Sequence, residues 1–193
     1  MRKNLTFVYL LALNMEYIKT EIDGLWIINP LVLKDERGYF MESYKKAEFE
    51  QKIGKTDFIQ DNESKSSYGV FRGLHYQEGE AAQAKLVRAI QGKVWDVAVD
   101  IRSGSPTFGK YVAVELSEEN KLQFFIPRGF AHGFVVLSET AVFSYKVDNI
   151  YSPAHERTIN FMDTDLAIQY PLDISQMRLS EKDRSGKRLK DMI

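Results

Sequence analysis

The sequence predicts a single domain of the all-β class. Short runs rich in β-branched and aromatic residues extend from Ile22 to about Tyr170, and clusters of Gly, Pro, Ser and Asn separate them. The runs follow one another at intervals of roughly 8 to 12 residues, which is typical of antiparallel hairpins. Sustained helical periodicity is scarce in the same region. With 193 residues, of which 44% are hydrophobic, the chain is long enough to form a sandwich or barrel around one core.

The clearest strand is KVWDVAVDIR at 93–102. Its side chains alternate between an apolar face, with Trp95, Val97, Val99 and Ile101, and a face that leans polar, with Val94, Asp96, Ala98 and Asp100. Further strands are expected at 110–116, 122–127, 133–137 and 141–147. Helical signal is limited to about 45–53 and to a polar segment around 175–183, so we expect only short peripheral helices.

The two ends of the chain are expected to lie outside this domain. Residues 1–14 include the apolar run Phe7 to Leu13, which weakly resembles a secretory signal but lacks a small-residue cleavage site after it. An N-terminal extension or an upstream start codon is therefore favoured, and the domain is expected to span 15–183. Residues 184–193 are expected to form a loosely held C-terminal tail.

Composition excludes several classes of function. The 26 basic and 27 acidic residues nearly cancel, so the chain lacks the positive charge that nucleic-acid binding requires. No apolar run reaches the roughly 20 residues that span a bilayer, and no membrane role is expected. The absence of cysteine excludes disulfide scaffolds and thiol chemistry and fits a reducing compartment, so a cytoplasmic location is expected.

Polar residues within the apolar segments predicted to be strands are the candidates for function. Burial of a charged group is costly unless a partner compensates it. Four places qualify, and they contain Arg72 and His75, Lys85 and Arg88, His132, and Tyr145. Lys85 and Arg88 point to opposite faces of one strand, so both can be solvated only on an edge strand. Each case also has a structural interpretation, such as a surface hairpin or a core histidine with a satisfied hydrogen bond.

Metal chemistry is not expected from these residues. His75, His132 and His155 are widely spaced, and no His-x-His pair occurs that would place two ligands on one strand. Nucleotide-binding and serine-hydrolase motifs are absent as well. A histidine base, an orienting carboxylate, a cation for an oxyanion and a tyrosine acid instead suffice for proton abstraction next to a carbonyl.

A series of motifs in fixed order carries a more specific signal. These are KDERGYFMESY (34–44), QDNESKS (60–66), VFRGLHYQ (70–77), AQAKLVRAIQGKVWDVAVDIR (82–102), IPRGFAHGFVVLSETA (126–141), YSPAHE (151–156) and LSEKD (179–183). Together they closely resemble the dTDP-4-dehydrorhamnose 3,5-epimerase family. The resemblance implies a cupin-type jelly roll, a homodimer, no cofactor, and a dTDP-linked 4-keto-6-deoxy sugar as substrate.

The resemblance also implies roles for single residues. His75 corresponds to the base that removes a ring proton, and Asp183 to the carboxylate that orients it. Lys85 corresponds to the cation near the C4 oxygen, and Tyr145 to the proton donor on the opposite face of the sugar. Tyr151 matches the aromatic ring that stacks on thymine. Substrate contacts, besides Lys85, are expected from Arg37, Glu42, Gln60, Asp61, Asn62, Arg72, His132, Glu156 and Lys182.

Several alternatives stay open within this resemblance. A mono-epimerase that acts at C3 or C5 alone would retain His75, Asp183 and much of the binding set. A ketoisomerase of the same fold is less favoured because Tyr145 is retained. A non-catalytic nucleotide-sugar-binding cupin would be expected to have lost part of the His-Asp-Lys-Tyr set, which is intact here. A purely structural β-domain does not explain the charged residues within the predicted apolar strands.

Overall fold

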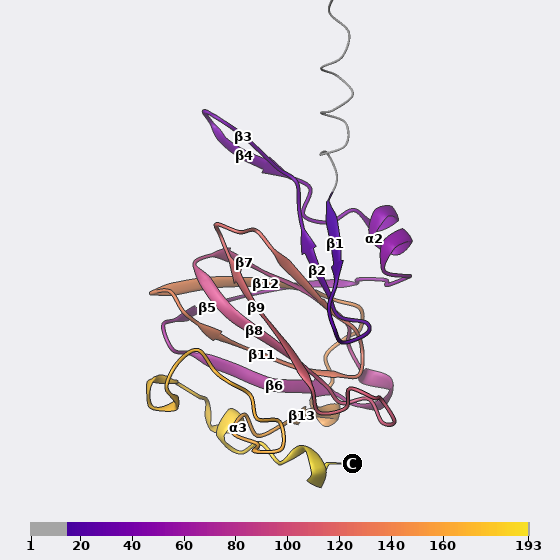
Figure 1. Ribbon diagram of the computed structural model, residues 1–193, viewed down its shortest axis with the longest axis vertical. Helices are drawn as coiled ribbons and strands as arrows, with labels where there is room; N and C mark the ends of the chain where they lie inside the picture. The colour runs from indigo at the N-terminus through magenta and orange to yellow at the C-terminus, as the bar shows by residue number, and fades with distance from the viewer. Residues whose placement is uncertain (1–14, 193) are drawn as a thin grey trace, which may run out of the picture.

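Two antiparallel sheets face each other in the computed structural model, which describes residues 15–192 (Figure 1). One sheet has six strands in the spatial order β1 (Glu16–Lys19), β2 (Trp26–Asn29), β10 (Gln123–Ile126), β7 (Lys85–Gln91), β12 (Thr140–Val147) and β5 (Gln60–Ser67). The other has five, in the order β13 (Glu156–Thr158), β6 (Phe71–Gln77), β11 (Phe130–Val136), β8 (Lys93–Asp100) and β9 (Tyr111–Ser117). The all-β prediction is confirmed, and each predicted strand lies within about three residues of an observed one.

The main core fills the space between the sheets. It is built from residues that alternate inward along their strands, such as Val87 and Ala89 of β7, Phe134 of β11 and Phe143 of β12. The rings of Phe134 and Phe143 stack with centroids 4.2 Å apart, which joins the two sheets directly. This core occupies one part of the interior and leaves the rest to polar side chains.

The polar-leaning face of β8 lies in the interior, not at the surface. Val94, Asp96, Ala98 and Asp100 are all fully buried. Both faces of β8 are covered, because Val97 and Val99 on the other side pack beneath the C-terminal segment. Alternation of polar and apolar residues normally indicates that one face of a strand is solvated. Because Asp96 is buried instead, its carboxylate needs a buried partner or a function.

Within residues 15–192, the helices lie at the periphery. Helix α2 (Lys46–Lys52) matches the predicted one and covers the outer face of the six-stranded sheet, where Phe49 packs edge-on against Phe125. The helix predicted around 175–183 is two separate pieces, η4 (Ile174–Gln176) and α3 (Glu181–Arg184). Between these pieces, the backbone N–H and C=O groups of Arg178 are hydrogen-bonded to Gly69 and Phe71. They are therefore not available for helical hydrogen bonds. The remaining 3₁₀ turns are η2 (Gly79–Ala81), η3 (Pro153–His155) and η5 (Leu189–Asp191).

The C-terminal residues are held against the five-stranded sheet, so the expectation of a loosely held tail is wrong for them. Leu189 is buried, and its backbone N–H donates to the buried carboxylate of Asp163 over 2.8 Å. Lys187 forms a bridge with Ile159. The prediction for residues 1–14 lies outside the described residues. Among residues 15–192, no helix is long and apolar enough to cross a membrane.

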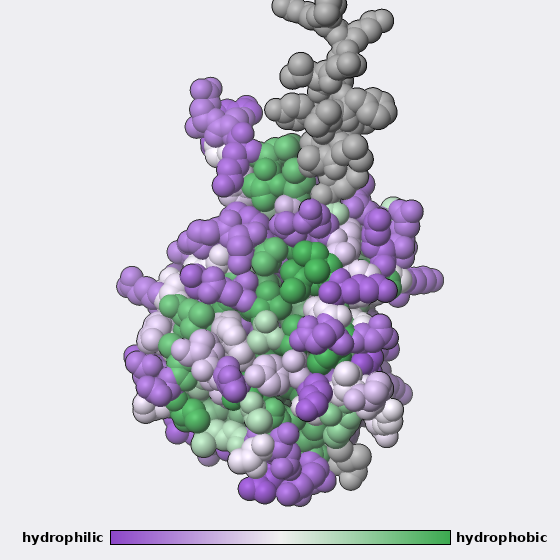
Figure 2. Space-filling view, in the orientation of Figure 1, coloured by the Kyte–Doolittle hydropathy of each residue, from purple (hydrophilic) through white to green (hydrophobic). Residues whose placement is uncertain are grey.

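A hairpin of β3 (Val32–Asp35) and β4 (Gly38–Met41) projects from the body of the molecule (Figure 1). Its large apolar side chains are unusually exposed for a single chain, with Phe40 65% and Leu33 50% accessible. Figure 2 shows hydrophobic atoms near the base of the hairpin and hydrophilic atoms toward its tip.

Candidate active site

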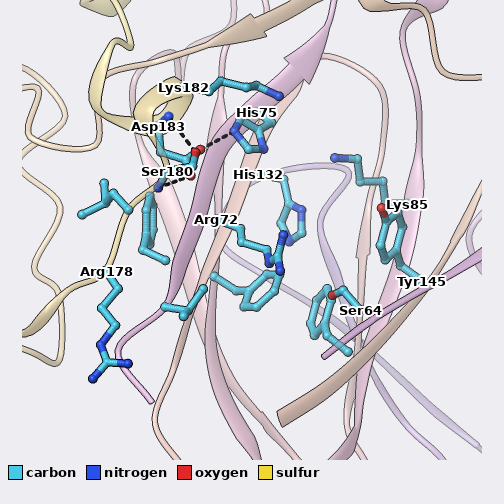
Figure 3. A pocket seen from close by; sticks show the side chains of 15 residues that line it. Ser64, Arg72, His75, Lys85, His132, Tyr145, Arg178, Ser180, Lys182 and Asp183 are labelled. Atoms are coloured by element: carbon cyan, nitrogen blue, oxygen red, sulfur yellow. Dashed lines mark hydrogen bonds and ion pairs between the residues drawn. The ribbon is translucent and has the colours of Figure 1, made fainter. Parts of the chain in front are cut away.

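A cavity of about 640 Å³ lies between the two sheets (Figure 3). Its walls come from β6 and β11 on one sheet, from β5, β7 and β12 on the other, and from the segment that contains α3. Its polar and charged lining residues are Ser64, Arg72, His75, Lys85, His132, Tyr145, Arg178, Ser180, Lys182 and Asp183. Four residues predicted from the sequence to be catalytic are therefore in one place.

His75 and Asp183 form a hydrogen-bonded pair although 108 positions separate them in the sequence. His75 Nε2 lies 2.6 Å from Asp183 Oδ1. The carboxylate is buried, with a residue exposure of 3%, and hydrogen bonds reach both of its oxygens. Burial alone would raise the pKa of Asp183, but the hydrogen bonds from His75 and Ser180 outweigh burial and lower it. An ionised carboxylate on one nitrogen leaves Nδ1 of His75 as the free nitrogen for proton transfer.

Two glycines explain how β6 brings His75 to this position. Gly73 has a φ of +144°, and a Cβ at this residue would lie 2.5 Å from the Cα of Gly133 on β11. The register between β6 and β11 shifts at the same point, between His132 and Phe134. A side chain at Gly73 would push the strands apart.

Lys85 lies at the start of β7, which is a central strand between β10 and β12. The sequence placed Lys85 and Arg88 on opposite faces, and Lys85 is the one that lines the cavity. Burial lowers the pKa of Lys85 to about 8, and Lys182 acts in the same direction, while the carboxylates of Asp96 and Glu156 oppose the shift. A cation with this pKa is still mostly protonated at neutral pH.

A second histidine–carboxylate pair lies on the sheet opposite Lys85. His132 Nε2 is 3.0 Å from Asp96 Oδ1 and 2.9 Å from Oδ2, and both residues are buried. Burial lowers the pKa of His132 and raises that of Asp96, and the attraction between the two opposes both shifts. Asp96 was not among the residues proposed from the sequence. The only signal was its place on the polar-leaning face of a strand that is otherwise apolar.

Tyr145 lies across the cavity from His75, on the opposite sheet. It belongs to β12, whereas His75 belongs to β6. Burial raises the pKa of the Tyr145 phenol. A protonated phenol and a free imidazole nitrogen therefore face the same space from two sides (Figure 3).

An adjoining cavity of about 330 Å³ shares His75, Lys85 and Tyr145 with the first. Gln60, Asn62, Tyr151 and Glu156 line it further out, and the Tyr151 phenol donates to Glu156 over 2.7 Å. Glu156 also forms an ion pair with Lys182. The two cavities together bring most of the predicted binding residues around one continuous space.

Three predicted contacts lie elsewhere. Asp61 points to the other face of β5 from Gln60 and Asn62, and Lys146 Nζ contacts its carboxylate at 2.8 Å. Asp61 therefore does not line either cavity of its own chain, because neighbouring residues of a strand face opposite sides. Arg37 and Glu42 lie on or beside the projecting hairpin, where Arg37 pairs with Asp35 and Glu42 with Lys45. They do not line the cavity of their own chain.

The arrangement provides a base, an acid and a cation around a partly apolar space, with a second chamber attached. Within the described part of the chain, no three His, Asp or Glu side chains gather as a metal-binding group would require. The chemistry that these residues can carry out themselves is proton removal and return at carbon next to a carbonyl.

Comparison with known proteins agrees with this chemistry. The sequence profile described as dTDP-4-dehydrorhamnose 3,5-epimerase matches residues 19–191. A dTDP-4-dehydrorhamnose 3,5-epimerase of Shigella flexneri is 53% identical over 178 residues, which cover 92% of this chain and 97% of that protein.

Two solved structures are similar as well. A dTDP-6-deoxy-D-glucose-3,5-epimerase from Legionella pneumophila, in complex with dTDP-4-keto-L-rhamnose, is 53% identical with a TM-score of 0.88, covering 92% of this chain and 94% of that one. A 3'-monoepimerase from Streptomyces bikiniensis, in complex with dTDP-quinovose, is 33% identical with a TM-score of 0.84, covering 90% and 87%. These likenesses confirm the expected cupin-type jelly roll. The chain belongs to the dTDP-4-dehydrorhamnose 3,5-epimerase family.

Proposed function

We propose that this protein is a dTDP-4-dehydrorhamnose 3,5-epimerase. It converts dTDP-4-dehydro-6-deoxy-D-glucose to dTDP-4-dehydro-L-rhamnose by removing and returning protons at C3 and C5, a step in dTDP-L-rhamnose biosynthesis. The observation that carries the proposal is the placement of His75 and Tyr145 on opposite sheets across one cavity. Inversion requires that a proton leaves one face of the ring and returns to the other, which such a pair can accomplish.

Proton removal is assigned to Nδ1 of His75. The C4 ketone makes the hydrogens on C3 and C5 acidic, so when a C–H bond breaks the electron pair moves onto the C4 oxygen as an enolate. His75 takes the proton and becomes a cation. Asp183, at 2.6 Å from Nε2, stabilises that cation and fixes the tautomer that leaves Nδ1 free.

Stabilisation of the enolate is assigned to Lys85. Its ammonium group would lie close to the C4 oxygen and interact most strongly when negative charge develops there, which lowers the barrier and not only the energy of binding. His132 lies on the opposite wall, on the sheet that also carries His75, and Asp96 holds its ring in place.

Return of the proton is assigned to Tyr145. Its phenol gives a proton to the ring carbon from the side opposite His75, and the enolate electron pair forms the new C–H bond as the ketone is restored. The burial that raises the pKa of Tyr145 keeps the phenol protonated before the transfer. The two catalytic residues then return to their starting states through exchange with solvent.

The adjoining cavity is assigned to the nucleotide. Tyr151 lines this cavity and is 53% exposed, so its flat ring is accessible to the thymine base. Arg72 and Lys182 supply positive charge for the diphosphate between the base and the sugar. Gln60 and Asn62 add hydrogen-bonding groups to the adjoining cavity. No residue of this set requires a cofactor.

We further propose that the protein is a homodimer in which the β3–β4 hairpin reaches the site of the partner subunit. Arg37 and Glu42 are expected to contact the substrate, yet they lie on or beside an arm that points away from the cavity of the same chain. A second subunit would reconcile these observations and would also cover the exposed Leu33 and Phe40.

A cytoplasmic location is proposed on the basis of composition. The chain has no cysteine, which fits a reducing compartment.

The proposed function can be tested by proton NMR in deuterated water. Purified protein is incubated with dTDP-4-dehydro-6-deoxy-D-glucose, and deuterium entry and configuration are followed at C3 and C5. Deuterium at both carbons with inversion at both, absent without protein, would support the 3,5-epimerase. Inversion at one centre alone would assign a mono-epimerase, which the likeness to the Streptomyces bikiniensis protein makes a real alternative. No exchange by folded protein would favour a binding role.

A further inference from the structure

Ser180 donates a hydrogen bond to the oxygen of the Asp183 carboxylate that His75 does not contact. Its hydroxyl lies 2.6 Å from Asp183 Oδ2, whereas His75 lies 2.6 Å from Oδ1. The backbone N–H of Gly73 approaches Oδ1 as well, at 3.4 Å. The two oxygens of Asp183 thus have separate partners from two parts of the chain that are far apart in sequence (Figure 3).

The same contact begins helix α3. Ser180 is the N-cap of the helix, and its Oγ accepts from the backbone N–H of Asp183 over 3.2 Å. In return, the Asp183 carboxylate accepts from the backbone N–H of Ser180 over 3.4 Å, which completes a capping box. Four residues are too few to form a stable helix alone. The capping box therefore fixes the backbone and the side-chain angle of Asp183 together.

The hydrogen bond from Ser180 also acts on the charge of Asp183. An O–H donor at 2.6 Å from a carboxylate has the short length of a charge-assisted hydrogen bond. Burial raises the pKa of Asp183, and the donors His75 and Ser180 reverse that effect. Charged or titratable groups from the neighbouring elements also face this pair, namely Arg72, Lys85, His132, Glu156 and Lys182.

We propose that Ser180 is a positioning residue for the epimerase reaction, which holds Asp183 ionised and directed at His75. This inference rests on the proposed function, since it assigns a role around the same base. Ser180 contributes to catalysis through Asp183 and His75 and needs no contact of its own with the reacting carbons. A serine that only begins a helix would affect stability alone.

The test compares Ser180→Ala, Ser180→Gly and Ser180→Thr with the wild-type protein. Glycine is nearly as good an N-cap as serine but has no hydroxyl, so Ser180→Gly separates the start of the helix from the hydrogen bond to Asp183. Ser180→Thr keeps the hydroxyl. Ser185→Ala is the matched control, because the Ser185 hydroxyl donates to the carbonyl of Lys182, over 2.9 Å, and not to a carboxylate.

The alanine and glycine variants are both expected to lose about tenfold in kcat, which is the size expected for a hydrogen bond to a charged group. Without this donor the pKa of Asp183 rises, so protonation of Asp183 ends activity at a higher pH, and the acid limb of the kcat/KM profile moves upward. Ser180→Thr should restore both quantities, and Ser185→Ala should leave both unchanged.

Three results would overturn the role of Ser180 while leaving the epimerase function intact. The first is a wild-type kcat in the glycine variant. The second is an acid limb of the kcat/KM profile that does not move in either the alanine or the glycine variant. The third is an equal loss of kcat in the threonine and alanine variants. Absence of epimerisation by the wild-type protein in the same assay would instead contradict the proposed function. Thermal unfolding of each variant shows that the protein compared is folded.

Discussion

The carboxylate of Asp96 contacts Nε2 of His132 through both oxygens, at 3.0 and 2.9 Å, in a position that solvent does not reach. Asp96 also raises the pKa of the buried Lys85 by attraction. One carboxylate behind the cavity wall thus acts on two of the groups that line it. A buried charge of this kind is costly to maintain without a partner, and His132 and Lys85 supply that compensation.

Asp96→Asn is therefore expected to alter the pH dependence of the reaction. Loss of the negative charge lets burial lower the pKa of Lys85 further below about 8. Lys85 would then lose its proton at lower pH, and the basic limb of the kcat/KM profile would move downward. The measurement is the pH profile of epimerisation for both proteins. A basic limb that is unchanged in a folded Asp96→Asn protein would show that Asp96 does not act on Lys85.

Lys85→Met should reduce kcat by roughly 10² to 10³, the effect of removing one group that stabilises an oxyanion. Methionine preserves most of the stem of the side chain but carries no charge. In the wild-type protein, activity should decline as the pH rises through about 8, because Lys85 loses its proton there. This decline should be absent from the residual activity of the variant. Steady-state rates between pH 6 and 10 test both statements, and Arg88→Met on the outer face of β7 is the control.

His75→Ala is expected to abolish deuterium exchange at both C3 and C5, because one base serves both centres in this account. Asp183→Asn should retain some exchange but lose roughly 10² to 10⁴ in rate, since an amide cannot stabilise the imidazolium. Proton NMR in deuterated water measures both variants. Exchange at either carbon at the wild-type rate in His75→Ala would remove His75 from the role of base.

The proposed dimer predicts complementation between two inactive variants. Arg37→Ala removes a group that would serve the partner's site, and His75→Ala removes the base of its own site. After unfolding, mixing and refolding, half of the dimers would contain one variant of each kind, and each of these would have one intact site. About a quarter of the wild-type activity per subunit should return. If the mixture stays inactive although it refolds as dimers, Arg37 does not act across the interface.

Much of the fold and part of the site could be predicted from the sequence. Period-two alternation predicted that Lys85 and Arg88 lie on opposite faces of their strand. The strand is central in its sheet, and Lys85 lines the cavity. The same rule would have separated Asp61 from Gln60 and Asn62, which are its neighbours on β5. The resemblance assigned the whole motif to the substrate, whereas alternation divides the motif between the two faces of the strand.

Other features depend on contacts between distant parts of the chain. His75 and Asp183 are 108 residues apart, and without the resemblance to a family no local pattern links them. Asp96 was overlooked because a polar residue on a strand face normally indicates solvent, whereas both faces of β8 are covered. The helix predicted around 175–183 is interrupted because Arg178 pairs with the strand edge near Gly69, a tertiary contact that local propensity does not report.

In the proposed mechanism, His75 removes protons and Tyr145 returns them from the opposite face of the sugar. Tyr145→Phe tests it most directly, because the variant keeps the ring, and one spectrum in deuterated water reports both exchange and inversion at C3 and C5. In this variant, exchange through His75 should continue, while the rate of inversion should fall at least tenfold relative to the rate of exchange. Equal losses of exchange and inversion, or inversion at the wild-type rate, would contradict the division of roles between the two residues.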